Sequence, residues 1–251
     1  MLICLDIGNT STSYALYKGR SLRKYGRIAS DNIPLLTRKL MASRDRHLIT
    51  NIVVSSVVPL LTNKISKLLS RGRGVRIWVI GRDLRVRIKH KYLRINKLGS
   101  DRLVNVYGAI KLYGPPLLIL DYGTALTGDY ISGKGIYEGG LIIPGPEIAL
   151  KALSAKAALL PEIPFPYKAT GLIGRDTKSG MKSGILNGYG ALTDGVVERF
   201  RKRFGQKFRV VATGGLAEVV ARFSSRIDTV DPLLTLKGIR ELFLDQVKIP
   251  S

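Results

Sequence analysis

The chain has 251 residues, with a hydrophobic content of 45% and a charged content of 24%, which is typical of a soluble globular protein. Its 41 Lys and Arg residues outnumber its 18 Asp and Glu residues, so the formal net charge at pH 7 is +23. No apolar run is long enough to span a membrane, and one Cys with two His residues excludes an internal disulfide and a zinc cluster.

The first half of the chain is predicted to mix strands and helices. Apolar alternation predicts a β-hairpin over residues 1–18. Five further elements are predicted before residue 114: a short helix at Ile33–Met41, a strand at Asn51–Pro59, a helix at Leu60–Ser70, a strand at Val75–Ile80 and a helix at Asp101–Leu112. Gly114-Pro115-Pro116 interrupts regular secondary structure and predicts a boundary between two domains, 1–115 and 116–251.

The second half repeats this alternation. Strands are predicted at Leu117–Leu120, Thr127–Ile131, Ile136–Pro144 and Arg209–Thr213. Helices are predicted at Glu147–Leu153, Ser183–Phe204, Leu216–Arg222 and Leu233–Leu244. Strands and helices that alternate along a chain indicate the α/β class.

A short motif occurs once in each half. Asp6-Ile7-Gly8-Asn9-Thr10 follows one apolar run and Asp121-Tyr122-Gly123-Thr124 follows another, at a common offset of 115 residues. Glycine turns let backbone N–H groups approach a phosphate closely. A carboxylate cannot bind phosphate directly, so the two acids indicate a cation such as hydrated Mg²⁺ between them and the phosphates. The repeat therefore predicts two related halves that grip a nucleotide.

A third motif, Gly99-Ser100-Asp101-Arg102, stands at the start of a predicted helix. Its Asp could accept a proton from a substrate hydroxyl, and its Arg could hold a carboxylate or a developing phosphoryl charge. The alternative interpretation is a helix cap with a neighbouring ion pair.

The positive charge is concentrated in Lys18–Arg27, Arg71–Arg94 and Arg199–Arg209. Patches of this kind can bind nucleic acid or acidic membranes. We do not expect a nucleic-acid partner, because no recognition helix, zinc finger or RNA-binding signature accompanies the charge. The positive field should instead attract anionic substrates.

Taken together, the motifs resemble those of type III pantothenate kinases. The resemblance covers nearly the whole chain and is carried by the three motifs above and by a further set: Ser55–Pro59, Gly139–Gly145, Ile173–Thr177, Ser183-Gly184, Thr213–Gly215 and Asp231–Leu236. It implies tandem duplicated ribonuclease-H-like (actin-like ATPase) domains around a nucleotide cleft. It also implies a cytoplasmic homodimer that phosphorylates pantothenate with ATP, Mg²⁺ and a monovalent cation, K⁺ or NH₄⁺, in the first step of coenzyme A synthesis.

The resemblance also assigns roles to residues. Asp101 matches the proton acceptor, Asp121 the ligand of the monovalent cation, and Asp6 the residue that holds Mg²⁺ through water. The segment expected to bind ATP comprises Asp6, Ile7, Gly8, Asn9, Thr10, Ser11, Thr12 and Ser13, together with Thr124. The residues expected to contact pantothenate are Tyr92, Gly99, Ser100, Asp101, Arg102 and Thr177.

The chain departs from the family pattern near the acceptor. Ser100 replaces a frequent Ala, Asp176 replaces a frequent Asn, and a common Tyr-x-Asn-Pro segment is here Tyr92-Leu93-Arg94-Ile95. Two alternative functions therefore stay open at this point: a related kinase that phosphorylates a different small alcohol, and a non-catalytic regulator that binds nucleotide or nucleic acid.

Overall fold

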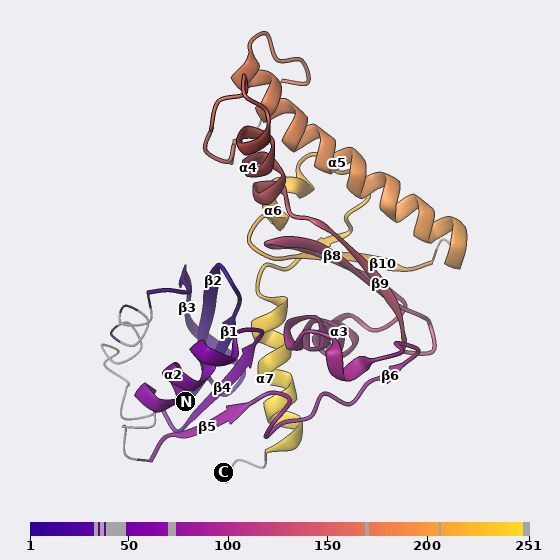
Figure 1. Ribbon diagram of the computed structural model, residues 1–251. Coiled ribbons are helices and arrows are strands. Elements are labelled where there is room, and N and C mark those ends of the chain that lie inside the picture. The colour runs from indigo at the N-terminus through magenta and orange to yellow at the C-terminus, as the bar shows by residue number, and fades with distance from the viewer. Residues whose placement is uncertain are drawn as a thin grey trace. The chain divides into compact units, whose positions relative to one another are not determined.

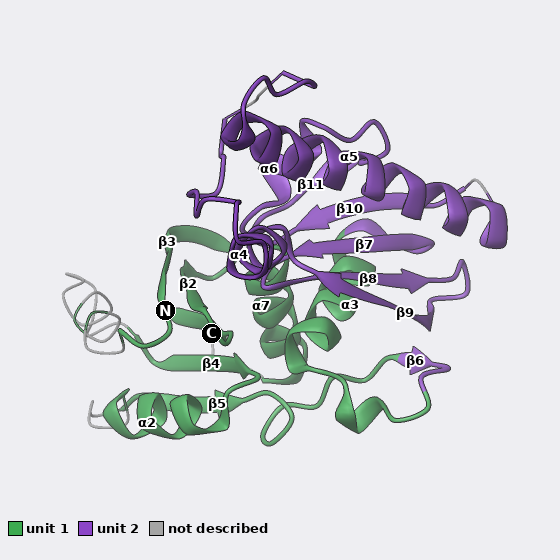
Figure 2. Ribbon diagram, turned by 45° about the horizontal axis from the view of Figure 1, so that its top comes forward, with its two compact units in different colours: residues 1–88, 93–112, 234–251 green, residues 89–92, 113–233 purple. Residues whose placement is uncertain are grey.

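The computed structural model describes residues 1–32, 35, 38, 49–69, 74–168, 171–205 and 207–247. The chain forms two compact units, shown in Figure 2. Unit 1 comprises residues 1–88, 93–112 and 234–251, and unit 2 comprises residues 89–92 and 113–233. The helix predicted at Ile33–Met41 lies almost entirely outside the described residues.

Unit 1 is built around a mixed sheet (Figure 1). Its strands are β1 (Leu2–Ile7), β2 (Ser11–Lys18), β3 (Ser21–Ala29), β4 (Asn51–Ser56) and β5 (Arg76–Val79). Among the described residues their order in the sheet is β3-β2-β1-β4-β5. The helices of this part of the chain are α2 (Pro59–Leu69), the 3-10 helix η2 (Ile95–Lys97), α3 (Ser100–Tyr113) and α7 (Leu234–Gln246).

Unit 2 contains a second mixed sheet. Its strands are β6 (Lys89–His90), β7 (Leu117–Tyr122), β8 (Ala125–Ile131), β9 (Ile136–Pro144), β10 (Arg209–Thr213) and β11 (Thr229–Val230). In the described part of the chain their order is β11-β10-β7-β8-β9-β6. Its helices are α4 (Pro146–Lys156), α5 (Thr177–Phe204) and α6 (Ala217–Ala221).

The two sheets share one topology. In each, a central strand pairs antiparallel with the strand that follows it and parallel with a strand from further along the chain: β1 with β2 and β4, and β7 with β8 and β10. Continuing outwards, β3 corresponds to β9 and β5 to β11, and unit 2 adds β6 at its edge. The repeat read from the two Asp-x-Gly turns therefore extends to whole sheets.

The central strands are buried on both faces. In β1, β4 and β7 four consecutive residues are buried, as expected for strands covered on both sides. One face of the unit 1 sheet packs Ile3, Leu5 and Val54 against Ile65 and Leu69 of α2. In unit 2, residues of β7 and β10 share a core with Ile185, Tyr189 and Val197 of α5.

Helix α7 belongs to unit 1 although it follows unit 2 in the sequence. It contacts β1, β4 and β2, and it crosses α3 at a pair of glycines. A Cβ on Gly238 would lie 2.6 Å from Val104 O, and one on Gly108 would lie 2.7 Å from Gly238 Cα. The division predicted from the sequence, 1–115 and 116–251, groups α7 with the second half of the chain, whereas the structure groups it with unit 1.

Two further differences from the predicted elements have local causes. Strand β3 was not predicted, because it is a mostly exposed edge strand whose charged residues conceal any alternation. Helix α5 begins at Thr177 and not at Ser183, because Asp176 caps it. The Asp176 side chain accepts the Ser179 N–H at 2.9 Å in a capping box.

The single cysteine behaves as expected of a core residue. Cys4 is free and buried in β1, and burial raises the pKa of its thiol. Among the described residues, no helix combines the length and apolar character needed to cross a bilayer.

The α3–α7 crossing generates a stability prediction. We expect Gly238→Ala to lower the free energy of unfolding by about 1–3 kcal/mol, because the new methyl group overpacks a backbone contact. Urea unfolding followed by the fluorescence of Trp78 measures this directly, since Trp78 packs edge-on against Phe243 of α7 with ring centroids 6.0 Å apart.

Gly195→Ala is the matched control, because Gly195 lies inside α5 and a Cβ there meets no atom within 4 Å. It should raise stability by about 0.4–1 kcal/mol. Equal effects of the two substitutions would contradict the close crossing.

Candidate active site

The carboxylate of Asp6 stands at the end of β1 between two hydroxyl-bearing neighbours. In the strand register Asp6 lies opposite Ser13 of β2 and opposite Ser55 of β4. Side chains of paired residues project from the same face of a sheet. The central strand of unit 1 therefore presents an acid flanked by two hydroxyls at its carboxyl end.

The turn after Asp6 is held by its own backbone and by one distant serine. Gly8 N donates to Ser11 O at 3.0 Å, and a Cβ on Gly8 would lie only 3.1 Å from that oxygen. The buried hydroxyl of Ser30 donates to Gly8 O at 2.7 Å, and Ser30 N donates to Thr10 O at 3.1 Å. Ser30 was not identified from the sequence, because nothing local to it signals a role 22 residues away.

The predicted nucleotide-binding residues of this turn differ in exposure. Asn9 and Thr10 are exposed, and Ser11 is half-buried. The side chains of Ile7 and Thr12 are buried, and the Thr12 hydroxyl lies 3.0 Å from that of Ser30. These two residues could reach a ligand only through their backbone.

The start of α3 is tied to the end of β4 by Ser100. Its hydroxyl lies 3.1 Å from Ser55 Oγ, accepts the Ser56 N–H at 3.1 Å and donates to Ser56 O at 3.0 Å. The Ser100 side chain is thus engaged with β4, whereas a capping role would direct it to the first turn of α3. Because Ser55 is paired with Asp6, this contact brings the Gly99–Arg102 segment to the end of the sheet at which Asp6 lies.

The carboxylate of Asp101 is oriented by its neighbours. Its Oδ1 accepts the Arg102 N–H at 2.8 Å, and it lies in the first turn of α3, where the helix dipole favours a negative charge. A Cβ on Gly99 would overlap Asp101 Oδ1, so a glycine is needed there for this orientation. Arg102 is 7% exposed.

Unit 2 repeats the arrangement around Asp121. At the end of β7, Asp121 lies opposite Thr127 of β8 and opposite Thr213 of β10. The Oγ1 atoms of both threonines are buried and have no hydrogen-bond partner among the described residues. Buried polar atoms are nearly always paired, so this pair beside a carboxylate points to a ligand that contacts them. Thr213 was not recognised as a site residue from sequence; only the β7–β10 register shows it.

The turn after Asp121 is closed by a backbone hydrogen bond from its glycine, as is the turn after Asp6. Gly123 N donates to Ala125 O at 3.0 Å, and Gly145 N donates to Thr124 O at 3.0 Å. Thr124 is exposed. Gly214, with φ of +91°, follows Thr213, and a Cβ there would overlap Asp121 Oδ1. The backbone at Gly214 therefore passes close to the carboxylate of Asp121.

Both clusters offer oxygen donors. Carboxylate and hydroxyl oxygens are ligands that suit Mg²⁺ and alkali cations. The described residues contain no group of three or more His, Cys, Asp and Glu side chains that could hold a metal ion. The hydroxyls beside Asp6 and Asp121 and the oxygens of a bound ligand would therefore complete a cation's coordination.

Two predicted acceptor residues lie in unit 2. Tyr92 follows β6 and stacks on Tyr137 of β9, with centroids 5.7 Å apart and an interplanar angle of 19°. Thr177 is the exposed first residue of α5, next to Asp176. The hydrogen bonds from the backbone and side chain of Ser179 lower the pKa of the Asp176 carboxyl.

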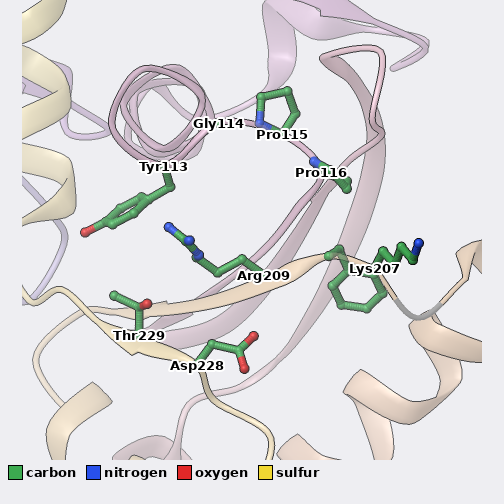
Figure 3. Close-up of a pocket in the computed structure, with 9 residues that line it drawn as sticks. Tyr113, Gly114, Pro115, Pro116, Lys207, Arg209, Asp228 and Thr229 are labelled. Carbon is green, nitrogen blue, oxygen red and sulfur yellow. The ribbon is translucent and has the colours of Figure 1, made fainter.

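A pocket in unit 2 lies away from Asp121 and Thr213. It is formed where β7 and β10 begin, at the opposite end of both strands from Asp121 and Thr213 (Figure 3). Figure 3 shows the Arg209 guanidinium directed toward Tyr113, and its carbon lies 5.8 Å from the ring centroid. The Tyr113 hydroxyl in turn donates to Asp231 at 2.7 Å. We do not assign this pocket to the candidate active site.

Comparison with known families gives one match over most of the chain. The model of the family described as "Type III pantothenate kinase" matches residues 2–199.

Several solved structures share the fold at low sequence identity. A conserved putative Baf family transcriptional activator from Campylobacter jejuni has 19% identity and a TM-score of 0.58, with 97% of this chain and 98% of that chain covered. A putative 2-dehydro-3-deoxygalactonokinase from Sinorhizobium meliloti has 9% identity and a TM-score of 0.61, with 100% and 98% covered. An activator of 2-hydroxyisocaproyl-CoA dehydratase from Clostridium difficile, with bound ADPNP, has 14% identity and a TM-score of 0.54, with 100% and 99% covered.

These likenesses show the fold. The chain has the mixed α/β, two-sheet fold of actin-like ATPases and sugar kinases, and the predicted fold class is confirmed.

Proposed function

Because the chain belongs to the type III pantothenate kinase family, whose activity is the ATP-dependent phosphorylation of pantothenate in coenzyme A synthesis, we propose that Asp101 is its general base. The observation that carries this proposal is the triple contact of Ser100 with Ser55 and Ser56. It holds the Gly99–Arg102 segment against the end of β4, whose Ser55 pairs with Asp6 of β1. The proposed proton acceptor and the proposed phosphate-binding turn would then share the carboxyl end of the unit 1 sheet.

Asp101 would accept the proton of the pantothenate hydroxyl while the hydroxyl oxygen attacks the γ-phosphorus of ATP. The bond from that phosphorus to the β,γ-bridging oxygen breaks, and ADP leaves. Phosphoryl transfer needs mainly positioning and charge neutralisation, so one oriented carboxylate and well-placed cations suffice. Arg102, Gly99 and Ser100 would contact pantothenate, together with Tyr92 and Thr177. The Arg102 guanidinium is suited to pair with the pantothenate carboxylate.

The Asp6–Ser13 segment and Thr124 would hold ATP. Gly8 permits a close approach of backbone N–H groups to the phosphates, and Asn9 and Thr10 are exposed beside it. Bound Mg²⁺ neutralises charge on the phosphates. Asp6 would hold it through water. The net charge of +23 supports rapid association with two anionic substrates.

Asp121, Thr127 and Thr213 would hold a monovalent cation, K⁺ or NH₄⁺. The support is the pair of buried threonine hydroxyls that find no partner in the described part of the chain and that flank a carboxylate in register. A cation in contact with them would satisfy both hydroxyls and offset phosphate charge.

We also propose a cytoplasmic homodimer. Unit 2 exposes large apolar side chains on the segment between α4 and α5, and an interface would cover such a surface: Leu159, Leu172 and Ile173 are 93%, 75% and 81% exposed. The one free, buried cysteine fits a reducing compartment.

The function is tested by measuring ADP release with and without pantothenate, and by detecting the phosphorylated product by mass. ADP formed in equal amounts with phosphopantothenate, and only when pantothenate is present, is the expected result. ADP release that ignores pantothenate would contradict the assignment.

We expect Asp101→Asn to lower kcat roughly 10²–10⁴-fold in this assay, which is the usual contribution of a positioned general base. The amide can still accept the Arg102 N–H, so the unfolding midpoint should hardly change. Glu218→Gln removes the same charge from an exposed position on α6 and should leave kcat unchanged. Near-normal turnover by Asp101→Asn would remove Asp101 from the role of base.

We expect K⁺ to raise both the activity and the thermal unfolding midpoint of the wild type, and Thr213→Val to abolish both responses. Without K⁺ the variant should be at least as stable as the wild type, because a buried hydroxyl without a partner costs about 1–3 kcal/mol.

Ser66→Ala is the control for this variant. It removes a buried hydroxyl from α2 in unit 1 that likewise lacks a hydrogen-bond partner among the residues described. The control should keep the full K⁺ response. A Thr213→Val enzyme that still responds fully to K⁺ would place the cation elsewhere.

A further inference from the structure

The ring of Tyr92 rests on a buried aromatic residue whose hydroxyl is anchored to a carboxylate. Tyr92 stacks on Tyr137, as described above, and Tyr137 is 0% exposed. The Tyr137 hydroxyl donates to Asp129 Oδ1 at 2.6 Å, and Asp129 is 1% exposed. Hydrogen bonds to a carboxylate are short and strong, so this one fixes the tilt of the Tyr137 ring.

The backbone before Tyr92 is attached to the same strand. Lys91 N donates to Tyr137 O at 2.9 Å, and Lys91 Nζ lies 2.8 Å from Glu138 Oε2. The ring of His90 places Nδ1 3.1 Å from Tyr92 O. The residues leading into Tyr92 are therefore fixed to β9 through both backbone and side-chain contacts.

A β-bulge in β9 gives Tyr137 its position. Tyr130 of β8 pairs with Gly139 and Ile131 pairs with Tyr137, so Glu138 is the extra residue. Gly139 has φ of +118°, and a Cβ there would lie 3.9 Å from Tyr92 Cδ2. Bulges re-aim side chains next to functional sites.

The residues after Tyr92 offer less support. The next residue, Leu93, is 99% exposed. The contacts that fix the Tyr92 ring therefore come from β9, through Tyr137 and Asp129.

We propose that Asp129 and Tyr137 are positioning residues that hold the Tyr92 ring in the orientation that binds the acceptor. The inference rests on the proposed function, in which Tyr92 contacts pantothenate. Asp129 anchors the Tyr137 hydroxyl, the Tyr137 ring supports that of Tyr92, and neither residue contacts the reacting atoms.

The test is a double-mutant cycle in steady-state kinetics. Tyr137→Phe keeps the stacking ring and removes only the hydroxyl that Asp129 accepts. It should raise KM for pantothenate about tenfold, with kcat and KM for ATP within about twofold of the wild type. Tyr92→Ala alone should raise KM for pantothenate at least as much. Adding Tyr137→Phe to Tyr92→Ala should change KM for pantothenate by less than about twofold, because the Tyr92 ring that Tyr137 supports is already absent.

Two further variants separate positioning from general damage to the fold. Tyr113→Phe also removes a tyrosine hydroxyl that donates to an aspartate, at 2.7 Å in the same unit. Its partner Asp231 follows β11, at the opposite lateral edge of the sheet from β9 and β6, so this variant should leave KM for pantothenate unchanged. Asp129→Asn keeps an oxygen that can accept the Tyr137 O–H. Its KM for pantothenate should therefore be closer to the wild-type value than that of Asp129→Ala.

Different results would contradict the proposed role of Tyr92 and the positioning role of Asp129 and Tyr137. If Tyr92→Ala leaves KM for pantothenate unchanged, the proposed role of Tyr92 fails. If Tyr92→Ala raises KM but Tyr137→Phe does not, or if Tyr137→Phe has its full effect in the Tyr92→Ala background, the positioning role is overturned. A fall in kcat with equal increases in KM for both substrates would indicate a structural role only.

Discussion

Strand register determines what surrounds the acid at the end of each central strand. Asp6 lies between Ser13 and Ser55, and Asp121 lies between Thr127 and Thr213. A slip of one residue would turn each acid to the opposite face and bring different side chains beside it. The registers are fixed by apolar neighbours, such as Leu5 and Leu120, that are buried in the two cores. The packing of the sheets thus determines the chemistry at their carboxyl ends.

The two halves use the same arrangement differently. In the first half, Ser55 is engaged by Ser100, so the hydroxyl beside Asp6 holds the segment that carries Asp101. In the second half, no residue that the structure describes forms a hydrogen bond with the hydroxyl of Thr127 or of Thr213. One duplicated framework would then supply two functions: attachment of the base segment in unit 1, and coordination of a cation in unit 2.

Much of this could be predicted from the sequence, because charge, glycine and hydrophobic runs are local signals. Asp6, Asp121 and the Gly99–Arg102 segment carried the family resemblance, which the family match confirms. Residues that act through distant pairing gave no such signal. Ser30 supports the Gly8 turn across 22 residues, and Thr213 reaches Asp121 only through the β7–β10 register. Strand β3 was missed because its exposed, charged residues show no alternation.

The central claim extends the proposed function: each of these two acids would hold a cation within its own unit, and the binding of Mg·ATP would depend on both acids. Calorimetric titration of Mg·ATP into the wild type, Asp6→Asn and Asp121→Asn tests it most directly, with Glu218→Gln as the charge-matched control. The account predicts that each site variant binds at least about tenfold more weakly, the scale of one lost charge-assisted contact, while the control binds as the wild type does. Wild-type affinity in either site variant would contradict it.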